Sequence, residues 1–508
     1  MSVVVPGTVA FTVNGQPVEV PDDGWSLLDV LRERLGLHSV KDGCSPQGQC
    51  GCCTVLVDGA PRVACVTPAR RVAGRAVVTL EGLPDAASWA GAFCAAGASQ
   101  CGFCTPGIIV RLAAQRGPVD QALLAHLCRC TGWQTIVEAA GAVGRPEPAP
   151  GDRDLDAAAR RAGLEGHTHQ RVAPDIAAGA GGFADDTAPA DALVAVRAAE
   201  GTWVVGESAP EARAAAGRVQ GRRSTVALSW PVNLPPGAWD RTLRTTWVEP
   251  GYLEPDSSWC APGGEPVTPL ANGGAFGGKQ ASLVGAVARR LADEHGRAVR
   301  VLLSREDVVR LGPKRPPIAA GIDADGTGVL RAARTPGLAA AVASVAPRLT
   351  VEEVDVAGPP TSVDLRGAGW VEAVVLLSSL RPEAPDEVRS PNGAVATAVV
   401  DGGGVHVTVR CGDPLDEVVL RSYCIGAAHM ALGWVRSEGI AVDEAGAPQD
   451  LTIRSFGILR AVDMPPVTVR IEADDGPPVN GSDAVFAAVA AAAWRQLGHP
   501  PEWPARRR

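Results

Sequence analysis

The chain has 508 residues, of which 47 are basic and 56 acidic, giving a net charge of −9 at pH 7, and its length allows about three or four domains. No basic run is long enough to follow a phosphate backbone, which argues against a nucleic-acid partner. The N-terminus lacks the pattern of a signal peptide, and the longest apolar run, residues 484–494, is too short to cross a bilayer. We therefore expect a cytoplasmic protein without a membrane partner.

Short strands and one helix are predicted in the first 85 residues. Residues 9–20 alternate apolar and polar side chains around an Asn-Gly pair, the strongest short signal for a β-hairpin. Leucines at helical spacing predict a helix over residues 27–35, between a capping serine and a terminal glycine. An Asp-Gly pair then predicts a second hairpin, which pairs residues 54–57 with residues 61–64.

The loop GCSPQGQCGCC, residues 43–53, holds four cysteines. The second hairpin would return Cys65 to the side of Cys53. Two residues between Cys50 and Cys53 let both sulfurs face one metal across a turn, whereas Cys52 is left as a spare thiol. The predicted ligands are Cys44, Cys50, Cys53 and Cys65. Their spacing is close to that of plant-type [2Fe–2S] ferredoxins, but four thiolates also suit zinc, which stays open.

A second group of cysteines follows in CGFCTPG, residues 101–107, and CRCTG, residues 128–132. Both motifs precede predicted helices, whose positive N-termini favour an anionic cluster. In a reducing compartment, metal binding is favoured over disulfides, and the odd total of 13 cysteines points the same way. The predicted ligands are Cys101, Cys104, Cys128 and Cys130.

Together these motifs resemble the small iron–sulfur subunit of the molybdenum hydroxylases, the family of xanthine dehydrogenase and aldehyde oxidase. The resemblance covers nearly all of residues 8–141 and departs from the family by one extra residue in the first cysteine loop and by Trp133 in place of tyrosine. It implies a β-grasp ferredoxin-like domain over residues 1–85 and a four-helix domain over residues 86–145. Each would hold one [2Fe–2S] cluster.

A Pro-rich linker is predicted over residues 146–166, followed by a region that resembles a shortened molybdopterin-binding subunit over residues 167–508. The loop NGGAFGGK, residues 272–279, precedes a helical pattern and a strand, as in a phosphate cradle. One alternative is a nucleotide P-loop, but Gln280 lacks the side-chain hydroxyl that binds magnesium in such a loop. The other alternative is a plain glycine-rich turn.

By resemblance, this loop approaches molybdopterin, and residues 366–369 are similar to the family's RGxG turn. The cofactor-binding residues implied are Gly273, Gly274, Phe276, Gly277, Gly278 and Arg366. The family's catalytic glutamate position holds Ser482, which cannot act as a base near neutral pH, with Asp483 adjacent. The catalytic residue is therefore left unassigned. The pair His167 and His169 is expected to be solvated.

The expected fold is multidomain α+β: a β-grasp domain, a helical [2Fe–2S] domain and a shortened molybdopterin-binding-like region. One hypothesis is an oxidoreductase that hydroxylates a small heterocycle or aldehyde at molybdopterin and passes electrons through two [2Fe–2S] clusters. The alternative is a non-catalytic electron-transfer or assembly subunit with a degenerate molybdopterin region. No flavin domain is visible, so the expected partners are a flavoprotein subunit or another electron acceptor, and a full-length molybdenum subunit.

Overall fold

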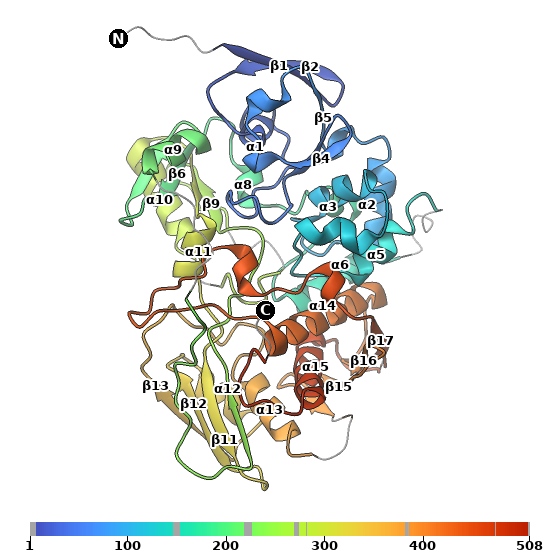
Figure 1. Ribbon diagram of the computed structural model, residues 1–508, viewed down its shortest axis with the longest axis vertical. Coiled ribbons are helices and arrows are strands. Elements are labelled where there is room, and N and C mark those ends of the chain that lie inside the picture. Colours follow the sequence, from blue (N-terminus) through green and yellow to red (C-terminus); the bar gives the residue numbers. More distant parts are fainter. Residues whose placement is uncertain are drawn as a thin grey trace.

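The computed structural model describes residues 7–145, 153–217, 226–268, 274–280, 282–381, 385, 387–472 and 474–505. Within them the chain forms one five-stranded and three four-stranded sheets, with helices between the sheets (Figure 1). The N-terminal sheet lies at one end of the molecule and the sheet that contains β11–β13 at the other. This is the multidomain α+β architecture expected from the sequence.

The N-terminal sheet has the strand order β2-β1-β5-β3-β4. The first hairpin closes where Val13 pairs with Gln16, as the Asn-Gly pair predicts. In the second hairpin Leu56 pairs with Pro61, so the returning strand begins one residue earlier than expected. The elements of this part are β1 (Thr8–Val13), β2 (Gln16–Pro21), α1 (Leu27–Asp29) continued by a π-helical turn (Val30–Arg34), β3 (Thr54–Val57), β4 (Ala60–Val63), short 3-10 turns (Ala64–Val66, Ala69–Val72 and Leu80–Gly82) and β5 (Ala76–Val78).

The cysteine motifs of the second group lie in a helical part that packs beside this sheet (Figure 1). The loop that ends at Cys104 leads directly into α3, and Cys104 is the N-cap of that helix. The helices are α2 (Ala86–Ala95), α3 (Thr105–Ala113), α4 (Val119–Ala122) with a 3-10 turn (Leu123–Ala125), and α5 (Gln134–Ala140).

The third part contains three sheets, with the orders β7-β6-β10-β9, β13-β12-β11-β8 and β14-β15-β16-β17. Its first elements are α6 (Leu155–Gly166), α7 (Pro174–Ala177), α8 (Ala184–Thr187), β6 (Leu193–Arg197), β7 (Trp203–Gly206), α9 (Ala209–Ala216), β8 (Arg241–Arg244), β9 (Ser257–Cys260), α10 (Val284–His295), β10 (Val299–Leu302) and α11 (Arg305–Leu311). The helix α10 and the strand β10 match the pattern predicted after the glycine-rich loop.

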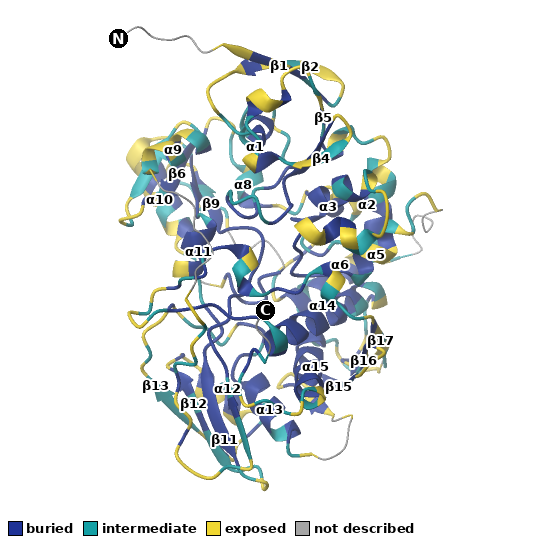
Figure 2. Ribbon diagram, in the orientation of Figure 1, coloured by how far each residue is buried: buried dark blue, intermediate teal, exposed yellow. Residues whose placement is uncertain are grey.

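Two helices, α14 and α15, form the centre of the core and are buried along nearly their whole length (Figure 2). Among the described residues, α14 alone is long and apolar enough to cross a membrane, but 89% of its most apolar stretch is buried inside the protein. The later elements are β11 (Ile318–Ile322), β12 (Gly328–Ala333), α12 (Leu338–Ala343), β13 (Leu349–Val354), α13 (Trp370–Ser378), β14 (Val388–Arg389), β15 (Val395–Val400), β16 (Val405–Arg410), α14 (Glu417–Arg436), 3-10 turns (Ile453–Phe456 and Ala461–Asp463), β17 (Val467–Ile471) and α15 (Ser482–Gln496).

Helix α6 occupies residues that the sequence assigns to the end of the Pro-rich linker, so that part of the linker prediction is wrong. Its side chains Arg161 and Glu165 are fully buried and form an ion pair of 3.0 Å. Glu165 accepts hydrogen bonds from the amides of Gly481 and Ser482, at 3.1 and 2.8 Å. The helix is therefore structural, because its carboxylate caps the start of α15.

We predict that Arg161→Met destabilises the protein by about 3–5 kcal/mol, because the buried carboxylate of Glu165 loses its counter-charge. The matched control is Arg171→Met, which removes the exposed ion pair with Asp175 and should change stability by less than about 1 kcal/mol. Urea unfolding followed by tryptophan fluorescence measures both. Equal effects of the two substitutions would contradict the role given to α6.

Candidate functional site

The first predicted ligand set forms one connected, buried group of thiols. The sulfur atoms contact one another in the order Cys50, Cys44, Cys65 and Cys53. Hydrogen bonds from the neighbouring thiols lower the pKa of Cys44. The amides of Gln47 and Gln49 also point at its Sγ, with N···S distances of 3.1 and 3.5 Å. Amides aimed at sulfur stabilise a thiolate, which suits the binding of an iron–sulfur cluster.

The second predicted set forms a similar group. Its sulfur atoms contact one another in the order Cys104, Cys128, Cys130 and Cys101. The sulfurs of Cys130 and Cys101 are 3.7 Å apart, and the hydroxyl of Thr131 lies 3.2 Å from the sulfur of Cys128. Because Cys104 is the N-cap of α3, the positive end of that helix faces the group. In each group the four thiols contact one another in series, which suits one [2Fe–2S] cluster per group.

Cys52 lies between the two groups and is fully buried. It contacts Cys50, and it is near enough to Cys101 for a charge interaction. The hydrogen bond with Cys50 lowers the pKa of the Cys52 thiol, but burial and the neighbouring thiols outweigh this and raise it. Cys52 therefore joins the first group only at one end, through Cys50, and its role as a spare thiol stays a prediction.

The two cysteine-bearing parts meet at a close backbone contact. A side chain at Gly107 would place its Cβ 2.5 Å from the carbonyl oxygen of Gly51 and 2.7 Å from that of Cys52. The ring of His126 fills the space beside this contact, 3.1 Å from Thr54 Oγ1. Burial lowers the pKa of His126 to about 3, so the ring is neutral. His126 was not identified from the sequence, because a lone histidine carries no motif.

The structure brings the glycine-rich loop and the RGxG turn together. The amide of Arg366 donates to the carbonyl of Phe276 at 3.1 Å, and the Arg366 guanidinium lies 4.0 Å above the Phe276 ring. At Gly277 a Cβ would lie 1.9 Å from a backbone oxygen, and at Gly278 it would meet Pro250 at 3.0 Å. These glycines are therefore required by close packing.

The same loop reaches the second cysteine group. A Cβ at Gly274 would lie 2.9 Å from the sulfur of Cys130. The other predicted glycine of the loop, Gly273, lies outside the described residues. The loop backbone therefore packs directly on a predicted cluster ligand.

Ser482 and Asp483 are both buried at the start of α15. The carboxylate of Asp483 forms an ion pair of 2.9 Å with His167 and one of 3.4 Å with Arg366. His167 and His169 are both exposed, as expected, but His167 also has a partner: it follows α6 in the left-handed conformation, which turns it toward Asp483. Since Asp483 is already paired with two cations, it is poorly suited to act as a general base.

Buried ion pairs close the space beside the glycine-rich loop. Arg129 and Glu438 form a two-bonded pair of 2.6 and 2.7 Å. Arg315 pairs with Glu372 in the same way, at 2.7 and 2.9 Å. The remaining cavity, whose lining includes Phe276, has a volume of about 30 Å³.

The volume of this cavity can be compared with the volume that molybdopterin would need. Sites for small organic cofactors have volumes of roughly 300–1,000 Å³, whereas a cavity of about 30 Å³ holds two or three waters. Four buried polar atoms of three nearby residues form no hydrogen bond within the described residues, namely Arg366 Nε and Nη2, Ser482 Oγ and Asp483 Oδ1. Of these, Arg366 Nε and Asp483 Oδ1 are the atoms of the 3.4 Å ion pair. The four atoms offer polar contacts, but the Arg366–Phe276 stack fills the space between them. Among the described residues, which do not include 269–273 and 281, the cavity beside the loop is too small for the cofactor.

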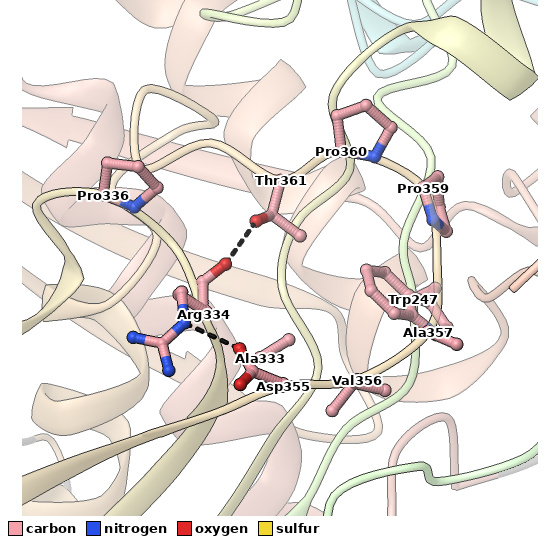
Figure 3. Close-up of a pocket in the computed structure, with 10 residues that line it drawn as sticks. All are labelled: Trp247, Ala333, Arg334, Pro336, Asp355, Val356, Ala357, Pro359, Pro360 and Thr361. Carbon is pink, nitrogen blue, oxygen red and sulfur yellow. Dashed lines mark hydrogen bonds and ion pairs between the residues drawn. The ribbon is translucent and has the colours of Figure 1, made fainter.

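A separate hollow of about 470 Å³ lies beside the ends of β12 and β13, and most of its lining residues follow these strands in the chain (Figure 3). It is bounded by Trp247 and three prolines, and its charged groups, Arg334 and Asp355, pair with each other at 2.7 Å. Its lining contains no cysteine or histidine. We assign it no part in the redox site.

We predict that Cys53→Ser lowers the iron content from about four to about two atoms per chain, whereas Cys52→Ala leaves it unchanged. The reason is that Cys53 contacts Cys65 within the set of predicted ligands, whereas Cys52 contacts that set only at its end, through Cys50, and is the predicted spare thiol. Iron determination on anaerobically reconstituted protein measures the difference. Loss of iron in Cys52→Ala with retention in Cys53→Ser would contradict the ligand choice.

A second prediction concerns pH. Burial lowers the pKa of His167, but the charge and hydrogen bond of Asp483 outweigh it and raise the value above the ordinary one. Because the pKa of His167 is higher in the folded protein than the value of about 6.5 in the unfolded chain, the ion pair stabilises the fold fully at pH values below about 6.5. This stabilisation is lost as the pH rises through the pKa of the folded protein. His167→Asn should therefore destabilise the protein more at about pH 5.5 than at about pH 8.5.

Unfolding free energies at the two pH values measure this effect. In an Asp483→Asn background the pH dependence should disappear, because the partner charge is gone. If His167→Asn lowered the free energy of unfolding by the same amount at both pH values, the ion pair would be excluded.

Two family models match the N-terminal part: the 2Fe-2S iron-sulfur cluster binding domain over residues 11–74 and the [2Fe-2S] binding domain over residues 79–141. The nicotinate dehydrogenase small FeS subunit of Eubacterium barkeri is 39% identical over 141 residues, 25% of this chain and 89% of that subunit. The xanthine dehydrogenase iron-sulfur-binding subunit of Escherichia coli O157:H7 is 40% identical over 146 residues, 26% of this chain and 89% of that subunit.

The whole fold is similar to the solved structure of aldehyde oxidoreductase from Desulfovibrio gigas. The TM-score is 0.70 at 16% identity, and the match covers 98% of this chain and 99% of that one. At this identity the likeness concerns the fold. The chain therefore belongs to the molybdenum hydroxylase family of oxidoreductases, and its N-terminal part carries two [2Fe–2S] domains.

Proposed function

We propose that this chain transfers electrons through two [2Fe–2S] clusters and that its third part is a structural scaffold without a working molybdopterin site. A [2Fe–2S] cluster accepts and releases one electron at a time. The observation that carries the proposal is the cavity of only about 30 Å³ beside the glycine-rich loop. This supports the electron-transfer alternative over a hydroxylase acting on a heterocycle or aldehyde.

The proposed cluster ligands are the two connected groups of cysteines. We assign the first group to a domain over residues 1–85 and the second to a domain over residues 86–145, with the scaffold over the rest of the chain. The protein's part is to hold the thiols close together in a buried setting and to aim backbone amides at them, as those of Gln47 and Gln49 are aimed at Cys44.

The second cysteine group is also held by the scaffold. Arg129, between two proposed ligands, is fixed by Glu438 and by the carbonyl of Pro250 at 2.8 Å. Gln100 donates to the carbonyl of Cys130 at 3.1 Å and to Ser422 at 2.9 Å. These contacts support a role for the third part in orienting the cluster-binding loops.

The hydroxylase remains the second candidate, because buried polar atoms near the loop, among them Arg366 Nη2 and Ser482 Oγ, have no hydrogen-bond partner among the described residues. It would require Asp483 to leave its ion pairs and Arg366 to leave Phe276. Electron exchange with a flavoprotein subunit, another acceptor or a full-length molybdenum subunit is part of the proposal. So is a cytoplasmic location, where thiols stay reduced.

Metal and pterin analysis of the purified chain separates the two candidates. We predict about four iron atoms per chain with molybdenum and pterin far below one per chain, even when the protein is produced in cells that make the cofactor. A co-produced full-length family member is the positive control for cofactor supply. Stoichiometric molybdenum and pterin in this chain would overturn the scaffold role.

A further inference from the structure

Residues 249–256, which we call the linking segment, are buried at every position and contact the surroundings of both cysteine groups. One backbone carbonyl of the segment accepts a hydrogen bond of 2.8 Å from Arg129, which lies between two proposed ligands of the second group. The carbonyl of Leu253 accepts a hydrogen bond of 2.7 Å from Nη2 of Arg305. The same nitrogen donates at 2.7 Å to the carbonyl of Gly43, the residue that precedes the first ligand. The two arginines therefore hold the linking segment close to both groups.

Glu254 is the next residue of the linking segment, and its side chain is only 3% exposed. Its Oε2 lies 2.5 Å from Nζ of Lys279, at the end of the glycine-rich loop. The same ammonium lies 3.9 Å from Oδ1 of Asp256, a second buried carboxylate. One cation is therefore shared by two carboxylates in a buried place, an arrangement that favours the binding of one proton.

The charged groups of the neighbouring elements have other partners. Asp186 of α8 is near enough to repel Glu254 and is itself paired with Lys41. The guanidinium of Arg305 donates to backbone carbonyls and forms no hydrogen bond with a carboxylate of the described residues. Within this part of the chain, Lys279 is therefore the cation that Glu254 depends on.

Three further side chains of the same region are also engaged. The hydroxyl of Tyr252 donates to Asp256 at 2.9 Å, and the ring of Tyr252 lies 5.0 Å from Nζ of Lys279. Glu249, at the start of the linking segment, is paired with Lys314 at 2.9 Å. These contacts leave the charge balance between Lys279 and the two carboxylates unchanged.

The acidity of Glu254 agrees with this geometry. Burial raises the pKa of Glu254 to about 7. The ion pair with Lys279 opposes the shift, whereas repulsion by Asp256 and Asp186 adds to it. A carboxyl group with such a pKa binds or releases its proton in response to small changes in the charge nearby.

We propose that Glu254 is a proton-binding site coupled to the first cluster, which takes up one proton from solvent when that cluster is reduced and releases it on reoxidation. The inference rests on the proposed electron-transfer function, which supplies the electron. The electron reduces one iron from ferric to ferrous, and a carboxylate oxygen of Glu254 forms an O–H bond, so that the charge of the buried region does not change. An added negative charge raises the proton affinity of a nearby carboxylate, and by reciprocity the bound proton raises the reduction potential.

Redox titration of the complete, iron-loaded protein at pH values between about 5.5 and 8.5, followed by electron paramagnetic resonance, tests the proposal. The signal that is lost in Cys53→Ser identifies the first cluster. Because the reduced state binds the proton more tightly, we expect the reduction potential to fall as the pH rises through about 7. A tenfold gain in proton affinity on reduction corresponds to a fall of about 59 mV between the two limits.

Glu254→Gln removes the proton-binding carboxylate and leaves Lys279 beside Asp256. The potential of the first cluster should then be constant over this pH range and near the low-pH value of the unsubstituted protein, because glutamine is neutral like the protonated acid. The matched control is Glu265→Gln, which removes an exposed carboxylate paired with Arg289 and should keep the pH dependence. Lys279→Met, which removes the counter-charge, should move the fall in potential to higher pH.

Reduced-minus-oxidised infrared spectra give a second measurement: the band of a protonated carboxyl group should appear on reduction near neutral pH and be missing in Glu254→Gln. A potential that does not depend on pH, in a protein that holds both clusters, would overturn the proton site and leave the electron-transfer function in place. So would a pH dependence that persists in Glu254→Gln. Protein that holds no iron after reconstitution would contradict the electron-transfer function itself, and the proton site with it.

Discussion

The position of α3 depends on a close contact between backbones, in which Gly107 lies against the carbonyl groups of Gly51 and Cys52. This contact sets the distance between the two cysteine groups, because each group is carried by one of the two partners. Any side chain at Gly107 would push the groups apart. The neutral ring of His126 fills the remaining space and so keeps water and charge away from the contact.

The third part of the chain buries charged side chains, whereas the contact between the cysteine groups excludes charge. Charged side chains near the glycine-rich loop are paired with one another, as Arg129 is with Glu438 and Arg315 with Glu372. Buried charges persist where they are paired and hydrogen-bonded. In this chain the pairing also fills the volume that a cofactor would need. The fold of the family is therefore compatible with a scaffold that holds cluster-binding loops in place.

Elements of the fold could be predicted from the sequence where a local pattern of residues determines the structure. The Asn-Gly and Asp-Gly turns, the capped helix after residue 26, and the helix and strand after the glycine-rich loop lie where predicted. Both cysteine quartets are brought together as expected, because motif and hairpin place the sulfurs on one side. No local sequence pattern indicates the contacts between residues that are far apart in the chain. Neither Glu165 beside Gly481 nor His167 beside Asp483 could be inferred, since each depends on how α6 packs against α15.

Electron paramagnetic resonance of the fully dithionite-reduced protein tests whether this chain holds two [2Fe–2S] clusters close together. Two distinct signals are expected, with magnetic interaction between them that disappears when one cluster is left oxidised. A single signal, or two signals without interaction at full reduction, would contradict this account.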